Sequence, residues 1–162
     1  SDADNLIVDF RNNPGGFLSA AIDISSWFLP EGETVVIERG REEKYNKEYT
    51  SGGHFLSGEY EMAILVNGGS ASASEIVAGA LQEHGRAKLV GTQTYGKGSV
   101  QELIKMKDDT ALKLTVAEWL TPGGLSISKE GLTPDVVIEL DADKLEKNGI
   151  DTQLEEAIKI LK

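Results

Sequence analysis

Two segments of the sequence carry side chains that could perform nucleophilic catalysis without a histidine. The first, Asn67-Gly68-Gly69-Ser70-Ala71-Ser72-Ala73-Ser74-Glu75, places three serines directly after a glycine pair. A serine at such a turn can present a nucleophile, and the flanking backbone N–H groups can form an oxyanion hole. The second, Tyr95-Gly96-Lys97-Gly98, places a lysine between two glycines. A lysine acts as a general base only when it is neutral, and burial favours the neutral form.

Both segments also have a structural interpretation, and the residues alone leave it open. Ser72-Ala73-Ser74-Glu75 matches the capping box that many helices use at their N-terminus. Lys97 could be an ordinary exposed lysine in a turn. If the strand that follows is regular, Lys97, Ser99 and Gln101 share one face, and the Gln101 amide could then hydrogen-bond to the lysine amine and orient it.

A third segment, Arg11-Asn12-Asn13-Pro14-Gly15-Gly16, has the same strand–glycine–helix character as the serine segment. Such junctions bring backbone N–H groups and a helix N-terminus to the end of a buried strand, which is a geometry that stabilises an anion. Neither junction has the glycine spacing of a phosphate loop or of a dinucleotide-binding turn. Nucleotide binding therefore has no motif to support it.

The elements that must position these segments alternate along the chain, which favours an α/β fold over an all-helical or all-β fold. We expect strands at 6–10, 34–37, 45–49, 62–66, 87–90, 99–106, 111–119 and 136–140, and helices at 17–28, from about 76 to 85, and at 154–161. A polar, glycine-rich loop is expected at 50–59 and a hairpin turn at 107–110. Trp27 is expected in the core, on the buried side of its helix.

Composition excludes several classes of function. The 162 residues are 40% hydrophobic and carry a formal net charge of −11, and they contain no cluster of lysine and arginine that would bind nucleic acid. No apolar run approaches the length needed to span a bilayer. The sequence has no cysteine, and His54 and His84 are its only histidines, so we expect no disulfide, no metal site and no cofactor.

Four motifs, in order along the chain, resemble the family of C-terminal processing, or tail-specific, serine proteases. They are Leu6-Ile7-Val8-Asp9-Phe10-Arg11-Asn12-Asn13-Pro14-Gly15-Gly16, the serine segment from Asn67 to Ile76, Tyr95-Gly96-Lys97-Gly98-Ser99-Val100-Gln101, and Gly131-Leu132-Thr133-Pro134-Asp135. The resemblance covers nearly the whole chain. Residues 40–61 are the part that it constrains least.

This resemblance implies an α/β, crotonase- or Clp-like core of stacked ββα units with additional β-hairpins. It implies that Ser72 is the nucleophile, Lys97 the general base and Gln101 the partner that orients the lysine. The backbone N–H groups of Gly16 and Ala73 would form the oxyanion hole. The activity implied is that of a serine endopeptidase that cleaves proteins from unstructured C-terminal tails.

The organisation expected from this resemblance is a single protease core domain at 1–162, shortened at its N-terminus and lacking the PDZ domain that precedes the core in the family. The partner would be a protein or peptide substrate with a free C-terminal tail, and no nucleic acid. Membrane association would be peripheral and confined to the full-length protein, which the resemblance places outside the cytoplasm. The sequence does not indicate an oligomeric state.

Two other functions remain open at the level of sequence. One is a binding module on the same fold without catalysis, although such a module would have no need of serine, lysine and glutamine together. The other is a crotonase-like acyl-CoA enzyme that uses the glycine turns as an oxyanion hole for a thioester. The sequence offers no evident adenine or phosphate site for the second function.

Overall fold

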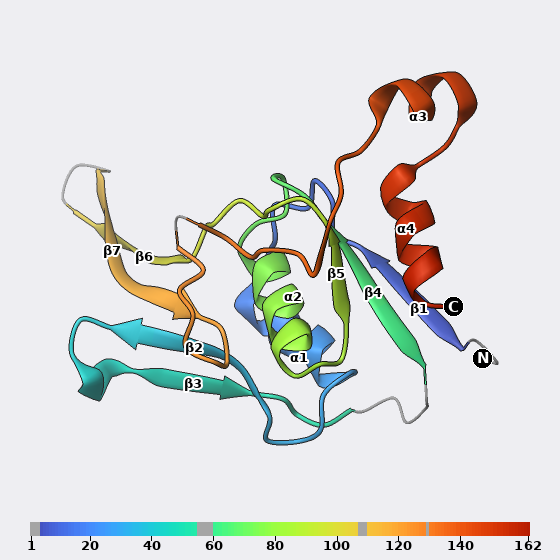
Figure 1. Ribbon diagram of the computed structural model, residues 1–162. Coiled ribbons are helices and arrows are strands. Elements are labelled where there is room, and N and C mark those ends of the chain that lie inside the picture. The colour runs from blue at the N-terminus through green and yellow to red at the C-terminus, as the bar shows by residue number, and fades with distance from the viewer. Residues whose placement is uncertain (1–3, 55–59, 107–109, 129) are drawn as a thin grey trace.

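The computed structural model describes residues 4–54, 60–106, 110–128 and 130–162. The chain forms two four-stranded sheets (Figure 1). The parallel sheet has the order β1-β4-β5-β8, made of β1 (Asn5–Asp9), β4 (Glu61–Val66), β5 (Lys88–Gly91) and β8 (Val136–Val137). The antiparallel sheet has the order β3-β2-β7-β6, made of β3 (Lys47–Thr50), β2 (Thr34–Gly40), β7 (Ala111–Leu120) and β6 (Ser99–Lys105). The chain is therefore a mixed α/β structure, as the alternating pattern predicts.

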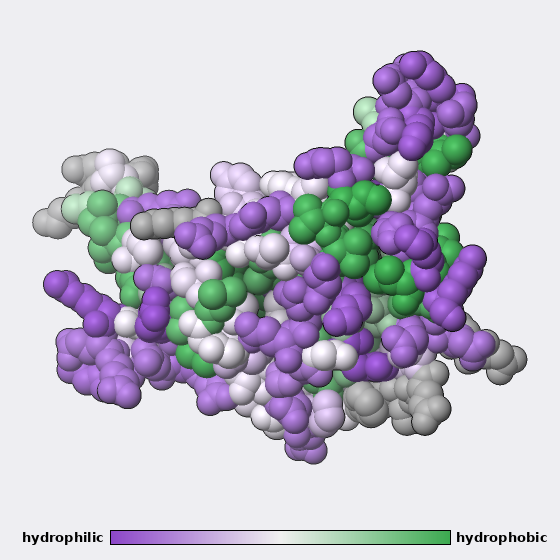
Figure 2. Space-filling view, in the orientation of Figure 1, coloured by the Kyte–Doolittle hydropathy of each residue, from purple (hydrophilic) through white to green (hydrophobic). Residues whose placement is uncertain are grey.

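Two helices, α1 (Leu18–Ser26) and α2 (Ala73–Glu83), lie between the sheets, and α4 (Thr152–Ile160) covers the opposite face of the parallel sheet (Figure 1). A short helix, α3 (Ala142–Asn148), precedes α4, and a single 3₁₀ turn, η1 (Glu43–Tyr45), lies between β2 and β3. No residue of α3 is buried, and its surface is hydrophilic at the upper right of Figure 2.

Strand β4 is the centre of the core because it is buried on both faces. Met62, Ile64 and Val66 pack toward α1 and α2, whereas Ala63 and Leu65 pack toward α4. A strand covered on both faces reads as a continuous apolar run rather than an alternating one, which is why residues 62–66 are recognisable in the sequence. The two helical layers make the parallel sheet a rigid support for whatever its strands carry.

Numbered in chain order, the first, second and third candidate segments follow three neighbouring parallel strands. β1 leads into residues 11–16, β4 leads into residues 67–72, and β5 leads into residues 92–97, and β4 pairs with both β1 and β5 in parallel. The carboxyl ends of parallel strands meet at one edge of a sheet, where open α/β folds place their ligands. The topology alone therefore brings the segments together.

Arg11 joins the first of these segments to α4. Its guanidinium donates to Asp9 at 2.7 Å, and to the Asp151 and Gln153 side chains at 3.0 and 3.1 Å. The hydrogen bonds that Arg11 donates to the Asp9 carboxylate raise the pKa of Arg11 above its usual range. Burial raises the pKa of Asp9, but its hydrogen bonds and ion pair with Arg11 outweigh this effect, and the net pKa is lowered. Arg11 thus anchors the N-terminus of α4 to the end of β1.

Most of the expected elements are confirmed, although α3 is not among them and α2 begins earlier than expected, at Ala73. Three further differences concern β8, Trp27 and β3. The expected strand 136–140 is ordered as a strand only at Val136–Val137, because the carbonyl oxygen of Ile138 accepts a hydrogen bond from the Gln153 side chain at 2.8 Å instead. Trp27 is 44% exposed, so its expected core position is wrong. It ends α1 as the C-cap and lies beside the His54 ring. The third difference is in residues 45–49, where the strand begins at Lys47 because η1 includes Tyr45.

The expected loop 50–59 and turn 107–110 lie partly outside the described residues. None of the helices within the described ranges is long and apolar enough to cross a membrane.

The two C-terminal helices provide a test of the Arg11 anchor. Asp151 caps α4 through the N–H groups of Gln153 and Leu154 and also binds Arg11, whereas Asp141 caps α3 through the Lys144 N–H without touching Arg11. We expect Asp151→Ala to lower the free energy of unfolding by about 2 kcal/mol, because a cap is lost and a partly buried guanidinium loses one acceptor. Asp141→Ala should lower it less. Urea unfolding followed by circular dichroism measures both, and equal losses would contradict the anchor.

Candidate active site

The first two segments are bound together by hydrogen bonds between their backbones and two asparagines. The Asn67 side chain accepts from the Asn12 N–H at 2.9 Å and donates to the Asn12 side chain at 3.1 Å. The Ala71 N–H donates to the Asn13 carbonyl oxygen at 3.0 Å. Asn12 has a φ of +57°, a conformation that asparagine adopts more readily than most residues. The Asn pair thus fixes the distance between the two turns.

Gly15 lies directly against the serine turn. A Cβ atom at Gly15 would come within 2.7 Å of the Ala73 nitrogen and 2.9 Å of the Ser72 Cβ, and the φ of Gly15 is +91°. No other residue could occupy this position without moving one of the two segments. The glycine of the Asn-Pro-Gly-Gly turn therefore serves close approach to the serine turn.

The three serines of the second segment differ in their contacts. The Ser70 hydroxyl donates to the Phe10 carbonyl oxygen at 2.8 Å, and the Ser74 hydroxyl donates to the Asn13 carbonyl oxygen at 3.2 Å. Both serines are buried, whereas Ser72 is partly exposed. Ser70 and Ser74 thus join the two turns, and Ser72 is the serine of the three that a ligand can reach.

Ser72 is the N-cap of α2 and has an uncommon backbone conformation, with φ +56° and ψ −118°. Such a conformation in a residue with a side chain costs on the order of 1–3 kcal/mol and is found mostly at functional sites. A sharp turn between a strand and a helix is also how hydrolases expose a nucleophilic serine. The capping interpretation is correct too, because the Glu75 carboxylate accepts from the Ser72 N–H at 2.9 Å. The Ser72 hydroxyl faces the Glu75 N–H, for which its oxygen is the acceptor, so the cap does not use the hydroxyl proton.

Glu75 does more than cap the helix, since its buried carboxylate also binds the third segment. One oxygen accepts from the Ser72 N–H and from the Lys97 N–H at 3.0 Å. The other accepts from the Gly96 N–H at 2.8 Å and from the Thr94 hydroxyl. Glu75 is 0% exposed, and a buried carboxylate is tolerated only where donors surround it. This carboxylate therefore sets the position of the Ser72 backbone relative to the Lys97 backbone.

The sequence predicts Glu75 only as part of the capping box and does not indicate its second role. The S-x-x-E spacing predicts the contact to the Ser72 N–H, which is local. The contacts to Gly96 and Lys97 span 21 and 22 residues of sequence and have no local signature. One signal was available, because an acidic residue in the middle of an otherwise apolar helix start is expected to be paired when it is buried.

Lys97 lies on the third segment, where Glu75 binds its backbone N–H, and Gln101 lies in β6. Both side chains are exposed, and within the described ranges neither forms a side-chain hydrogen bond or an ion pair. In the chain without a ligand, Glu75 binds the Lys97 backbone N–H, and the Lys97 side chain is left exposed. Ser99 and Gln101 both belong to β6, where the pairing irregularity between Val100 and Gln101 skips a residue of β7 and not of β6. The alternation that places Ser99 and Gln101 on one face of β6 is therefore kept.

The backbone N–H groups of Gly16 and Ala73 have no acceptor among the described residues, whereas the Gly15 N–H donates to the Asn13 side chain at 2.9 Å. A Cβ atom at Gly16 would meet nothing within 4 Å, so the space around this residue is open. Two unpaired N–H groups beside an open space can bind an oxyanion.

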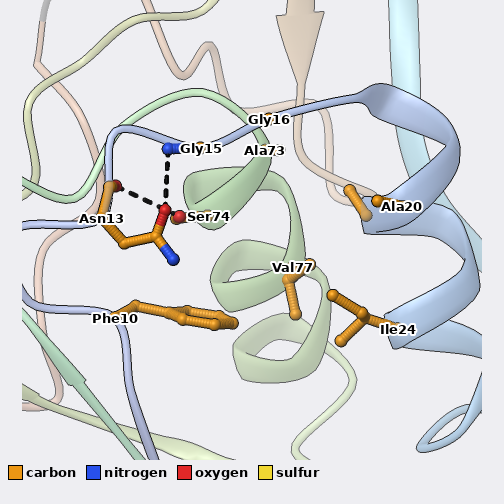
Figure 3. Close-up of a pocket in the computed structure, with 10 residues that line it drawn as sticks. Phe10, Asn13, Gly15, Gly16, Ala20, Ile24, Ala73, Ser74 and Val77 are labelled. Atoms are coloured by element: carbon orange, nitrogen blue, oxygen red, sulfur yellow. Dashed lines mark hydrogen bonds between the residues drawn. The ribbon is translucent and has the colours of Figure 1, made fainter.

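A cavity of about 130 Å³ lies next to these N–H groups (Figure 3). Its floor and walls are mostly apolar side chains from the first turn and from helices α1 and α2: Phe10, Ala20, Ala21, Ile24, Ala73 and Val77, together with Asn13, Gly15, Gly16 and Ser74. Figure 3 shows Ile24 and Val77 facing each other across it. The cavity can receive a small apolar side chain.

Known proteins of one peptidase family are similar to this chain. The model of peptidase family S41 matches residues 1–138. The carboxy-terminal-processing protease of Bartonella bacilliformis is 49% identical over 133 residues, which is 82% of this chain and 30% of that protein. The carboxyl-terminal-processing protease of Synechocystis is 45% identical over 139 residues, 85% of this chain and 31% of that protein.

Among solved structures, the photosystem II D1 C-terminal processing protease superposes with a TM-score of 0.77 at 31% identity, covering 98% of this chain and 39% of that one. The chain thus spans between 30% and 39% of the length of these relatives. Because the family model covers far more than half of the sequence, the chain belongs to peptidase family S41.

Proposed function

We propose that this chain is the catalytic core of a serine endopeptidase in which Ser72 is the nucleophile and Lys97 the general base. The observation that carries the proposal is the Glu75 carboxylate, which binds the backbone N–H groups of both residues with a single oxygen. The names of the similar proteins support the activity, since they are described as carboxyl-terminal processing proteases.

In this mechanism the neutral Lys97 amine takes the proton of the Ser72 hydroxyl as the oxygen attacks the scissile carbonyl carbon. The protonated lysine then gives that proton to the departing amine, and the C–N bond breaks to leave an acyl-enzyme. A water molecule then gives one proton to Lys97 as its oxygen attacks the ester carbonyl carbon. Lys97 returns this proton to the Ser72 oxygen as the acyl C–O bond breaks, which frees the product acid and restores the neutral amine. Lys97 is exposed without a ligand, so a substrate lying over it would displace water and thereby favour the neutral amine.

The remaining site residues take supporting roles in the proposal. The Gly16 and Ala73 N–H groups would donate to the oxyanion of the tetrahedral intermediate, each contributing on the order of 3 kcal/mol in the transition state. The Gln101 side chain would orient the Lys97 amine once a substrate covers both. Gly15 and the Asn12–Asn67 pair keep the two turns close enough for this arrangement.

We further propose a crotonase- or Clp-like arrangement for the two sheets and their helices, with residues 1–162 as one protease core domain. The substrate would be a protein with an unstructured C-terminal tail, and the full-length protein would act outside the cytoplasm and associate with a membrane only peripherally. No step of the mechanism needs a cofactor.

The first test compares serines within one segment. In the full-length protein, Ser72→Ala and Lys97→Ala should each lower kcat for peptide hydrolysis by at least about a thousandfold, because the nucleophile or its base is lost. Lys97→Arg should fail equally, since a guanidinium does not give up its proton at working pH. Ser74→Ala should keep measurable activity, because its hydroxyl contacts only the Asn13 carbonyl oxygen. Full activity of Ser72→Ala would disprove the assignment.

The second test addresses Glu75. Glu75→Gln replaces one accepting oxygen by an NH₂ group, which would face N–H donors, so the loops of Ser72 and Lys97 should separate. A misplacement of about 1 Å is enough to lower kcat about a hundredfold. Glu83→Gln is the matched control, because Glu83 lies on the same helix and accepts from the Thr121 hydroxyl and the Gly123 N–H. Steady-state kinetics of both variants would show whether the loss is specific, and an unaffected kcat in Glu75→Gln would rule out the positioning role.

The third test addresses the cavity, in which we place the substrate side chain that precedes the scissile bond. Ile24 forms a wall of the cavity and is 40% exposed, so its truncation should cost little stability. In Ile24→Ala the ratio of kcat/KM for leucine over alanine at this substrate position should rise about tenfold, the effect of a few methylenes in an apolar pocket. Matched peptides that differ only at that position measure the ratio. No change would place the side chain elsewhere.

A further inference from the structure

Strand β6 forms one edge of the antiparallel sheet and begins two residues after Lys97. Among the described residues only β7 pairs with it, and Figure 1 shows the β6–β7 hairpin extending away from the helices. An edge strand presents a row of backbone N–H and C=O groups that another chain can bind. In an antiparallel edge strand, only every second residue directs its backbone N–H and C=O groups outward.

The hydrogen bonds at the two ends of the hairpin show which residues of β6 face β7, and both ends give the same result. At one end the Met106 N–H donates to the Thr110 carbonyl oxygen at 2.9 Å, and at the other end the Trp119 N–H donates to the Gly98 carbonyl oxygen at 2.6 Å. Because bonded and non-bonded pairs alternate in an antiparallel ladder, the even-numbered residues of β6 bond to β7. The odd-numbered residues therefore direct their N–H and C=O groups outward: Ser99, Gln101, Leu103 and Lys105. Among the described residues, no strand pairs with this outer side of β6.

The same hairpin also exposes apolar side chains. Ile104 is 41% exposed and Leu112 is 44% exposed, and the two are paired across the strands. Leu114, two residues along β7 and so on the same face, is 40% exposed. Figure 2 shows apolar residues gathered over the hairpin at the left of the view. A strand added beside β6 could therefore place every second side chain against an apolar surface.

We propose that the outer edge of β6 binds the substrate polypeptide as an additional extended strand, with apolar substrate residues at alternate positions on the face of Ile104. The proposal rests on the proposed function and adds to it a binding site beyond the cavity at Ile24. Addition of a peptide strand to a sheet edge is a general mode of peptide recognition, in which backbone hydrogen bonds supply affinity without demanding one sequence.

Two observations favour a substrate over a second copy of this chain as the occupant. The outward-facing row begins at Ser99, beside the predicted base, so a chain that leaves the site is already next to the edge. A second copy would also carry the same net charge of −11, and the fully overlapped antiparallel pairing of two β6 strands would place Glu102 opposite Glu102. Like charges directly opposite each other weaken a strand pair.

The experiment measures peptide binding to the full-length Ser72→Ala protein, which binds without cleaving. A fluorescent peptide long enough to extend past the scissile bond along β6 is prepared as a series, with one backbone nitrogen methylated in each member. If the peptide pairs with β6, methylation should weaken the Kd by about threefold to tenfold at every second residue, as expected for one lost hydrogen bond. Equal Kd values along the whole series would overturn the proposal.

Two edge variants give an independent measure. Leu103→Pro removes one outward N–H without removing a bond to β7, and proline is tolerated on edge strands. Leu103→Ala, the matched control, shortens the same side chain and keeps the N–H. We expect Leu103→Pro to weaken the Kd about fivefold more than Leu103→Ala does. Equal Kd values for the two variants would contradict the proposal.

Two further measurements distinguish the ways in which the ideas can fail. Covalent labelling of Ser72 by a fluorophosphonate in the otherwise unchanged protein tests the proposed function alone, because the label needs no extended chain. If the fluorophosphonate labels Ser72 normally and all peptides of the methylated series bind with equal Kd values, only the β6 site is overturned. If sedimentation shows dimers that Leu103→Pro dissociates, the edge belongs to a second copy and the proposal is wrong.

Discussion

One buried carboxylate determines how the parts of this site lie relative to one another. The turns that follow β4 and β5 have no side-chain contact across Ser72 and Lys97 in the described structure, yet both bind Glu75 through their backbones. A charge buried to 0% exposure would be unfavourable alone, so its four donors must stay in place. The requirement to satisfy this carboxylate therefore restrains both turns even when no substrate is present.

That restraint also explains how the strained turn at Ser72 persists. The backbone conformation of Ser72, with φ +56° and ψ −118°, is unfavourable for serine. Interactions with the surrounding structure must therefore stabilise it. Glu75 bonds the Ser72 N–H from the helix side, and Gly15 packs against the turn from the other side. Beneath them, β4 is buried on both faces and offers no room for the turn to relax. The exposed hydroxyl is thus a product of packing on three sides.

Local sequence patterns predict the strands, helices and turns of this structure better than they predict the contacts between those elements. The apolar run at 62–66 and the glycine junctions identify strands, helices and turns, because those signals reside in neighbouring residues. Ser72, Lys97 and Gly16 are predicted as site residues because each stands in a recognisable motif. The second role of Glu75 and the anchor between Arg11 and Gln153 could not be predicted, because each depends on residues far apart in sequence. The two-residue β8 illustrates the same limit, since its end is set by a contact from α4.

The exposure of Lys97 bears on how such a site avoids unwanted chemistry. The resting chain binds the Lys97 backbone N–H through Glu75 and leaves the side chain exposed. A short contact at the cavity of Ile24 covers little of this surface, whereas a chain that also runs along β6 would pass over the lysine and Gln101 together. Desolvation of the base would then depend on the length of the bound segment. An extended, unstructured polypeptide would meet that condition and a folded surface would not, which is consistent with the preference for unstructured tails that we propose.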